Sequence, residues 1–266
     1  MRQRSWRIWQ VRNKIMRVII SPAKKMKTDT DTMDVRGLPA FLSQTEEICR
    51  KLQGMSYDDL KALWKCNDKI AQLNVERLAQ MDLRKNLTPA ILSYEGIQYQ
   101  YMAPGVFSDR EFAYVQEHLR ILSGFYGVLK PFDGVVPYRL EMQAKLSVDG
   151  KKDLYAYWGD SLAKHLSAET DCIINLASKE YSQSVSGYLP QSVRFITCVF
   201  GEWKDGKIVE KGTICKMARG EMVRFLAENQ IEDPEEIKAF SRLQYRYSEA
   251  HSDENTFVFL LQKGSA

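Results

Sequence analysis

The sequence predicts a single α/β domain in which helices cover a mixed β-sheet. Short runs rich in β-branched and aromatic residues, which are typical of buried strands, occur at residues 17–21, 172–176 and 257–262. Segments with the apolar period of a helix separate these runs, as is typical of strands joined in parallel. A hairpin signal at Asp205-Gly206 adds an antiparallel pair, so we expect a mixed sheet. No repeat, composition break or linker divides the 266 residues, which indicates one domain.

The first predicted strand, residues 17–21, runs into a basic loop that contains Lys24 and Lys25. Loops that follow strands often carry binding residues, but a solvated turn with two surface lysines explains the spacing equally well. Three helices are expected next, at residues 41–52, 56–64 and 67–81. Gly54 ends the first of them and Ser56 begins the second as its N-cap.

The segment from residue 90 to 102 mixes β-branched and aromatic side chains, and it predicts a strand that breaks near Gly96. Ser108 and Glu111 then have the spacing of a capping box, which marks the start of a helix. Apolar residues recur at helical spacing through this helix, at Phe112, Val115, Leu119 and Leu122. The helix is therefore expected to lead directly into the glycine-rich turn that follows.

That turn lies within residues 122–142, a stretch dense in turn-forming residues that we expect to form a fixed loop. Gly124 and Gly127 let the chain reverse, while the aromatic side chain of Tyr126 holds the turn to the core. Backbone N–H groups at such a turn can bind a phosphate oxygen. Together with Lys130, the turn predicts a helix-hairpin-helix-like element, although the usual motif has a shorter glycine spacing and a plain structural turn is the alternative.

The second half of the chain is expected to contain a helix, a strand, a hairpin, a helix and a last strand, at residues 155–166, 172–176, 194–211, 214–229 and 257–262. The helix at 214–229 places three basic side chains on one face, those of Lys216, Arg219 and Arg224. Gly220 on the same helix would allow another backbone to approach closely.

The charge of the chain is unevenly distributed. Residues 1–15 contain five basic residues and no acid, so the overall charge of +4 becomes −1 for residues 16–266, which hold 33 basic and 34 acidic residues. A basic surface in the main domain must therefore arise from local clustering. We expect residues 1–15 to be an extension that precedes a true start at Met16, the alternative being a flexible basic arm.

Several functional classes are disfavoured by the sequence. The five cysteines include no Cys-x-x-Cys pair and the three histidines are widely separated, so neither a disulfide scaffold nor a metal site is expected. No apolar run is long enough to span a bilayer, and we expect a cytoplasmic protein without a membrane partner. Walker, dinucleotide and nucleophile-elbow motifs are absent from the sequence, so no cofactor is expected.

A second group of candidate residues comes from the ends of predicted strands. Ser21 follows the first strand, and Asn175 and Ser178 lie at the end of another. The carboxyl ends of parallel strands meet at one edge of a sheet, where ligands commonly bind, and nearby Lys24 would favour a phosphate. Helix capping is the alternative role of Ser178. Glu141, Asp160 and Glu180 could supply a general base if the fold gathers them.

Six ordered segments resemble the YaaA family of peroxide stress proteins: SPAK at 21–24, LSGFYGVLKP at 122–131, PYRLEM at 137–142, KDLYAYWGD at 152–160, INLASKEY at 174–181 and KMARGEMVRF at 216–225. The likeness covers nearly all of residues 16–266 and implies one α/β domain with a helix-hairpin-helix element and a basic cleft that binds duplex or distorted DNA. It places Gly124, Tyr126, Gly127 and Lys130 in the hairpin. It suggests as cleft residues Lys24, Lys25, Arg139, Lys216, Arg219 and Arg224.

The resemblance and the basic residues together predict a cytoplasmic DNA-binding protein that limits DNA and iron-mediated damage under peroxide stress, without a cofactor and without an assigned catalytic activity. The alternative is an enzyme that acts on a nucleotide or another phosphorylated small molecule, with Ser21, Asn175 and Ser178 in its pocket. A common concave surface for Lys24, Lys216 and the Gly127 turn would favour the first hypothesis.

Overall fold

Eight strands form the central sheet of the structure, a computed structural model that describes residues 15–262. The predicted extension, residues 1–15, lies outside this range except for its last residue. The strands follow the order β11-β12-β9-β8-β1-β5-β6, and β10 pairs with β9. They are β1 (Arg17–Ile20), β5 (Leu119–Ser123), β6 (Gly127–Leu129), β8 (Cys172–Leu176), β9 (Arg194–Lys204), β10 (Lys207–Val209), β11 (Tyr245–Tyr247) and β12 (Thr256–Leu261).

The five inner strands β12, β9, β8, β1 and β5 run parallel, whereas β6, β10 and β11 pair antiparallel with their neighbours. Strand β1 is central, with Val18 level with Leu119 on one side and Ile174 on the other. All four residues of β1 are buried, as expected of a strand covered on both faces. The predicted mixed sheet within one α/β domain is confirmed.

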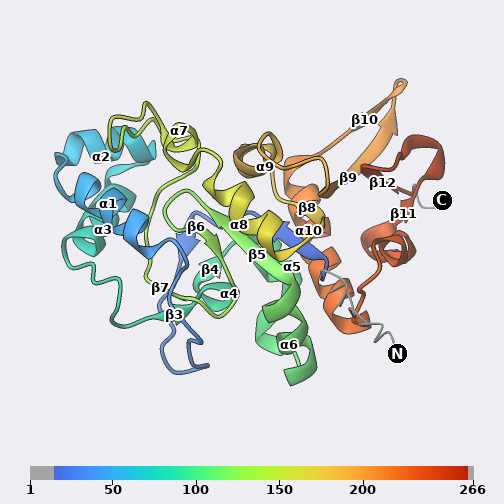
Figure 1. Cartoon of the computed structure of the whole chain (residues 1–266), viewed down its shortest axis with the longest axis horizontal. Coiled ribbons are helices and arrows are strands. Elements are labelled where there is room, and N and C mark those ends of the chain that lie inside the picture. The colour runs from blue at the N-terminus through green and yellow to red at the C-terminus, as the bar shows by residue number, and fades with distance from the viewer. Residues whose placement is uncertain (1–14, 263–266) are drawn as a thin grey trace, which may run out of the picture.

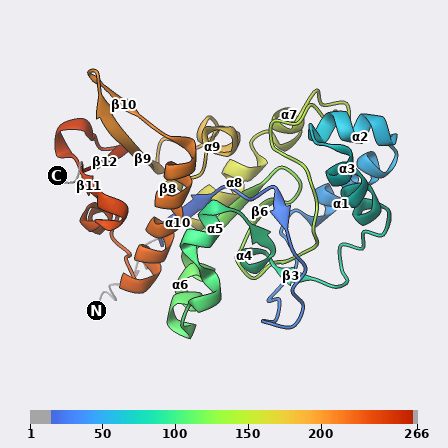
Figure 2. The same ribbon diagram turned by 180° about the vertical axis from the view of Figure 1, so that it is seen from behind.

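Ten α-helices flank this sheet in the described part of the chain. They are α1 (Leu42–Gln53), α2 (Tyr57–Trp64), α3 (Asp68–Ala79), α4 (Ala90–Ser93), α5 (Ile97–Met102), α6 (Asp109–His118), α7 (Leu154–Trp158), α8 (Ser161–Glu169), α9 (Lys179–Ser186) and α10 (Gly212–Asn229). Helices α1 to α3 gather at one end of the molecule, and β10, β11 and β12 lie at the other (Figures 1 and 2). No helix in residues 15–262 has the length and apolar character needed to cross a membrane.

Short elements complete the fold. Strand β2 (Lys25–Met26) pairs with β4 (Tyr94–Glu95), and β3 (Thr88–Pro89) pairs with β7 (Gly134–Val135). The 3₁₀ turns are η1 (Pro104–Val106), η2 (Pro234–Ala239), η3 (Arg242–Gln244) and η4 (Glu249–His251).

Local sequence signals explain where several elements begin. The Ser56 hydroxyl accepts a hydrogen bond from the Asp59 N–H at 3.2 Å at the start of α2. Ser108 and Glu111 form the predicted capping box at the start of α6. Asp205 and Gly206 have φ values of 51° and 77°, the left-handed pair that a tight hairpin between β9 and β10 requires. These predictions are confirmed.

The predicted strand at residues 90–102 is wrong. This segment forms α4, the short strand β4 and then α5, with the break at Gly96. All four residues of α4 are buried, so that helix shows no helical amphipathicity. Helix α5 buries Gln98, Tyr99 and Met102, but its six residues are too short a run to reveal the helical period.

The predicted helix through Leu122 is also too long. Helix α6 ends at His118, and Leu119 begins the buried strand β5. Because every residue of β5 is buried, Leu119 and Leu122 satisfy the helical spacing by coincidence. The predicted helix at residues 155–166 is likewise two helices, α7 and α8, which separate at Gly159, where φ is +49°.

The helix-hairpin-helix-like element is not found at Gly124 to Lys130. Strands β5 and β6 pair antiparallel there, so the turn closes a β-hairpin at the edge of the sheet. Phe125 and Tyr126 are completely buried, and their N–H groups donate to the Ser123 hydroxyl at 3.1 and 2.9 Å. These donors are therefore unavailable to a phosphate. The turn has a plain structural role, which is the alternative to a phosphate-binding hairpin.

The glycines of this hairpin allow close packing. A Cβ at Gly124 would lie 3.0 Å from the backbone of Glu141 and Met142, and Gly127 has a φ of +74° with three side chains about its α-carbon. The Gly124 carbonyl accepts a hydrogen bond from the Trp158 indole at 3.1 Å. Gly124 thus allows the segment that contains Glu141 to lie directly against the hairpin.

Asp133 follows the hairpin and gives the fold a pH dependence. Its buried carboxylate accepts a hydrogen bond from the Lys130 N–H at 2.8 Å, and burial raises its pKa from 3.8 to about 6. Since the folded pKa exceeds the unfolded one, this contribution to stability is complete below about pH 4 and is lost as the pH rises through 6.

We therefore expect Asp133→Asn to remove this pH dependence while it keeps an acceptor for Lys130. Urea unfolding of both proteins between pH 4 and pH 8 measures the difference. Wild-type stability should fall relative to the variant by about 2–3 kcal/mol over this range. A difference that stays constant with pH would show that burial does not perturb this carboxyl group.

Candidate functional site

A pocket of about 370 Å³ lies at the carboxyl edge of the parallel sheet. Ser21 directly follows β1, Ala177 and Ser178 follow β8, and the two strands are adjacent and parallel. In this sheet β1 is followed along the chain by β5, which lies on one side of β1. Strand β8, on the opposite side of β1, is followed by β9, which lies farther out in that opposite direction. Such a reversal of winding opens a crevice beyond the strand ends, where ligands bind in open α/β sheets.

Two serines join the loops at this crevice. The Ser178 N–H donates to the Ser21 hydroxyl at 2.8 Å, and the Ser21 hydroxyl donates to that of Ser178 at 3.2 Å. Ser178 precedes α9 but its side chain makes no capping hydrogen bond to that helix. The capping role that was the alternative for Ser178 is therefore absent, and its hydroxyl hydrogen remains available to the pocket.

Basic residues from three separate parts of the chain line the same pocket: Lys24, Lys25, Arg139, Lys216 and Arg219. Lys24 lies in the loop after β1 and Lys25 begins β2, Arg139 follows the hairpin segment, and the last two come from α10. The pocket thus contains seven of the thirteen residues predicted for the site, these five together with Ser21 and Ser178.

Close packing of α10 on α5 (Figure 2) brings the α10 residues into the pocket. At Gly220 a Cβ atom would overlap the backbone oxygen of Gln98 and lie 2.9 Å from the Met102 nitrogen. Glycine is therefore required where the two helix backbones meet. Arg219, which precedes Gly220, and Gln98 both line the pocket.

Some of the pocket's charges are already paired. Lys24 lies 2.5 Å from Glu141, and Lys25 lies 3.0 Å from Glu95, its partner across the β2–β4 pair. Both lysine side chains are largely exposed, so these ion pairs contribute little to stability and can open for a ligand. In the described part of the chain, neither Arg139 nor Lys216 forms an ion pair.

Three buried donor nitrogens of the pocket have no hydrogen-bond partner among residues 15–262: Gln98 Nε2, Arg139 Nε and Arg219 Nε. Gln98 is only 7 % exposed. A buried donor without a partner costs about 1–3 kcal/mol, so three of them in one cavity indicate a place for a ligand with several acceptor oxygens.

The carboxyl group of Glu180 also faces this cavity. Burial and the nearby charge of Glu141 raise the pKa of Glu180, although it accepts a hydrogen bond from the Gln143 N–H at 3.3 Å. Of the three acids considered as a general base, the fold brings Glu141 and Glu180 into the pocket, whereas Asp160 pairs with Lys164 on α8. A buried carboxyl group with a raised pKa is suited to proton transfer.

Tyrosines form the apolar wall of the pocket. The Tyr99 hydroxyl donates to the Ser21 carbonyl at 3.0 Å, which ties α5 to the loop after β1. Burial raises the pKa of Tyr138 to about 12, and its hydroxyl lies 2.6 Å from that of Ser123. These rings are fixed by the core and can support an apolar part of a ligand.

Six predicted site residues do not join the pocket. Gly124, Tyr126 and Gly127 belong to the buried hairpin, and the Tyr126 hydroxyl accepts a hydrogen bond from the Val136 N–H at 3.1 Å. Lys130 continues β6 toward the opposite edge of the sheet. Arg224 pairs with Glu228 at 2.7 Å, and buried Asn175 bonds to Ala177 and Thr197. The pocket therefore brings together Lys24, Lys216 and Arg219 on one concave surface but does not include the Gly127 turn.

Sequence reasoning missed Gln98, Tyr99 and Glu95 as pocket residues. Glu95 lies in β4, and Gln98 and Tyr99 lie in α5, all within the segment predicted as a strand that breaks near Gly96. Gly96 was the one available signal, since a Cβ there would lie 3.0 Å from Ala23 in the loop after β1.

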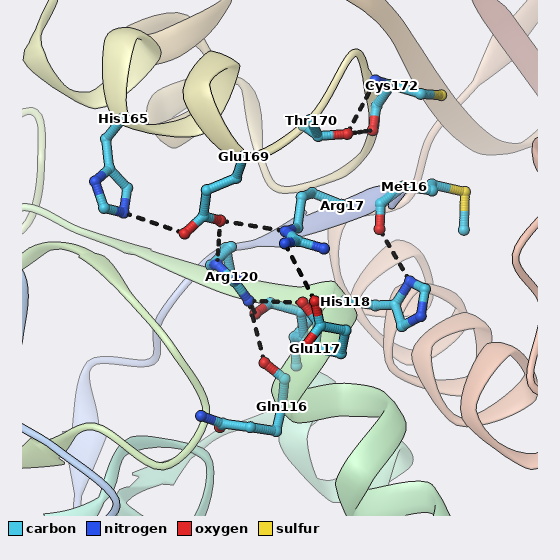
Figure 3. A network of polar contacts seen from close by, with 11 residues as sticks. Met16, Arg17, Gln116, Glu117, His118, Arg120, His165, Glu169, Thr170 and Cys172 are labelled. Atoms are coloured by element: carbon cyan, nitrogen blue, oxygen red, sulfur yellow. Dashed lines mark hydrogen bonds and ion pairs between the residues drawn. The ribbon is translucent and has the colours of Figure 1, made fainter. Parts of the chain in front are cut away.

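A second cluster of charged residues lies at the other end of β1 (Figure 3). Glu169 accepts hydrogen bonds from Arg17 Nε at 3.2 Å and from Arg120 Nε at 2.8 Å, and His165 Nε2 lies 3.6 Å from it. Burial favours the neutral acid, but the two guanidinium groups outweigh it and lower the pKa of Glu169. The cluster joins β1, β5 and α8, and we assign it a structural role.

Metal ligands are not gathered in the described residues: no three His, Cys, Asp or Glu side chains are arranged to hold an ion. The five cysteines are free, and Cys49, Cys198 and Cys215 are buried. Burial raises the pKa of each of these three thiols, which disfavours the reactive thiolate.

Comparisons with known proteins identify relatives over almost the whole chain. A family model described as "Peroxide stress protein YaaA" matches residues 16–251. A UPF0246 protein of Desulfitobacterium hafniense (strain Y51) is 56 % identical over 245 residues, which cover 92 % of this chain and 98 % of the relative. UPF0246 proteins of Lachnoclostridium phytofermentans and Pediococcus pentosaceus are 55 % and 52 % identical over 245 residues, covering 92 % of this chain and 96 % and 98 % of theirs.

Proposed function

This chain belongs to the peroxide stress protein YaaA family, and from that premise we propose that it acts in the cytoplasm by binding DNA under peroxide stress. The predicted hairpin is buried, so the proposal now rests on the pocket at the strand ends. On this proposal, the basic side chains of the pocket contact the phosphates of duplex or distorted DNA, and this binding limits oxidative damage to the DNA.

One observation carries the proposal, the convergence of Lys24, Lys25, Arg139, Lys216 and Arg219 on a single concave surface. Residues 16–266 have a net charge of −1, so a local group of five basic residues is not a consequence of overall composition. Lysine and arginine side chains bind DNA mainly through its phosphates. Such contacts convey no base sequence, so binding should depend strongly on salt and weakly on sequence.

We expect Lys216→Ala to weaken duplex and bubble DNA binding about tenfold, because it removes an exposed, unpaired cation of the pocket. Arg224→Ala is the matched control, since Arg224 lies two turns further along α10 and is paired with Glu228 outside the pocket. Fluorescence anisotropy on the chain that begins at Met16 avoids the basic residues before it. Equal affinity of the two variants would remove the pocket from the DNA-binding hypothesis.

A second candidate function is an enzyme that acts on a nucleotide or another phosphorylated small molecule. The specific observation in its favour is the pair Glu141 and Glu180 beside the linked serines, at the winding reversal where small ligands bind. Incubation with a nucleotide panel followed by chromatography tests it. Product that forms with wild type but not with Glu180→Gln would favour an enzyme, and no product from any nucleotide would count against one.

A further inference from the structure

The start of α9 lies at the pocket, which Ser178, Glu180 and Tyr181 line. The Tyr181 N–H already donates to the Ser178 carbonyl at 3.0 Å, but the Ser178 side chain caps none of the first N–H groups of this helix. The positive end of the helix dipole also favours an anion at this point. The hydroxyl hydrogen of Ser178 adds a further donor, because the hydroxyl accepts from Ser21 and its own hydrogen is unused in that pair.

The unpartnered side chains provide an independent sign of a ligand. Gln98 Nε2, Arg139 Nε and Arg219 Nε belong to residues that line the pocket, and all three atoms are buried. They come from α5, the segment after the hairpin and α10, so no single local irregularity explains them. Arg219 Nη2 lies 3.7 Å from Glu210, whereas its buried Nε has no hydrogen-bond partner within residues 15–262. A group with three or more acceptor oxygens would satisfy them together.

The charge of the pocket indicates how much negative charge the ligand carries. Five basic and three acidic residues line it, a formal excess of two positive charges. A phosphomonoester carries about −1.5 to −2 near pH 7 and has three terminal oxygens, whereas a diester within a DNA strand carries −1.

The size of the pocket also suits a terminal phosphate group. Its volume of about 370 Å³ is at the lower end of the roughly 300–1,000 Å³ range of small-ligand sites. The phosphate of a nucleotide can enter such a cavity with its sugar and base following along the tyrosine wall. An internal diester would have to continue on both sides of the same cavity.

We propose that the strand-end pocket is a phosphomonoester site, in which the start of α9, Ser178, Gln98, Arg139 and Arg219 surround one terminal phosphate. This inference rests on the proposed function in that it assigns the ligand of the same pocket. The terminal phosphate can come from a free nucleoside monophosphate or from the 5′ end at a break in a DNA strand. Both sources present the same dianion to the same donors.

The test compares probes that differ only in the terminal phosphate. Nicked duplex DNA with a 5′-phosphate at the nick is compared with the same duplex carrying a 5′-hydroxyl, and adenosine 5′-monophosphate is compared with adenosine. The chain from Met16 onward should bind at least one phosphorylated probe about tenfold more tightly than its unphosphorylated partner. A preference confined to the nicked duplex identifies the strand break as the source, and one confined to the monophosphate identifies the free nucleotide.

Arg139→Gln should abolish this preference, and Arg224→Ala should retain it. Lys216→Ala is a second pocket variant whose exposed side chain is not needed for folding, and it should reduce the preference. No preference for phosphate in either probe pair would overturn the inference. If intact duplex still binds in a salt-dependent way in that case, the proposed DNA-binding function survives without it, so the two failures are distinguishable.

Discussion

We expect Glu169→Ala to lower the free energy of unfolding by about 3–5 kcal/mol. Within residues 15–262, Glu169 is the one carboxylate that accepts hydrogen bonds from both Arg17 and Arg120, whose side chains are only 8 % and 3 % exposed. Removal of the Glu169 carboxylate leaves the two buried guanidinium groups without the negative charge that they share. A buried charge that has lost its partner is strongly destabilising. Urea unfolding at pH 7 followed by circular dichroism measures the effect.

Glu235→Ala is the matched control for this prediction. Glu235 also contacts two basic side chains, those of Arg194 and Lys238, but it is 51 % exposed. Surface ion pairs contribute about 0–1 kcal/mol, so this variant should remain close to wild type. Similar losses in the two variants would mean that the Glu169 cluster is no more important to the fold than a surface pair.

Gly220→Ala should be the second most damaging substitution, with a loss of about 3 kcal/mol. The added Cβ would overlap the backbone oxygen of Gln98, and a backbone atom cannot rotate away as a side chain does. Helix α10 must therefore shift from α5, and this shift moves Arg219 and Gln98, which both line the pocket. We expect the variant to lose both stability and affinity for the pocket ligand, measured by thermal unfolding and by DNA binding.

Gly212→Ala provides the control on the same helix. Gly212 is the first residue of α10, and apart from its chain neighbours and the backbone of its own helix, no described atom lies within 4 Å of a Cβ built there. Alanine is also the better helix former, so this variant should be as stable as wild type or slightly more stable. A Gly220→Ala protein with unchanged unfolding would contradict the close approach of the two helices.

The elements that could be predicted from the sequence are those with a local physical signal. Capping at Ser56 and Ser108 and the Asp205-Gly206 turn depend on hydrogen bonds and dihedral angles within a few residues. The segment 90–102 and strand β5 could not be predicted in this way. Every residue of α4 and of β5 is buried, and α5 has only six residues, so the apolar pattern carries no period that separates helix from strand.

The candidate site was predictable to the extent that it follows from strand ends. Ser21 and Ser178 come together because the carboxyl ends of parallel strands share one edge, a rule that needs no knowledge of the strand order. The glycine-rich turn resembles an anion-binding turn, but that role requires backbone N–H groups that face solvent. The motif itself does not reveal that the N–H groups of Phe125 and Tyr126 are buried and bonded to Ser123. Gln98 could not be identified, because an amide side chain in a misassigned segment gives no signal of its own.

The salt dependence of DNA binding tests the central claim most directly, that basic residues from distant segments form one phosphate-binding pocket. The slope of log affinity against log salt concentration reports the number of phosphate contacts. For the double variant Arg139→Ala with Lys216→Ala, the account predicts a slope shallower than that of wild type by about 2, and an unchanged slope for Arg224→Ala. Identical slopes for wild type, the double variant and Arg224→Ala would contradict it.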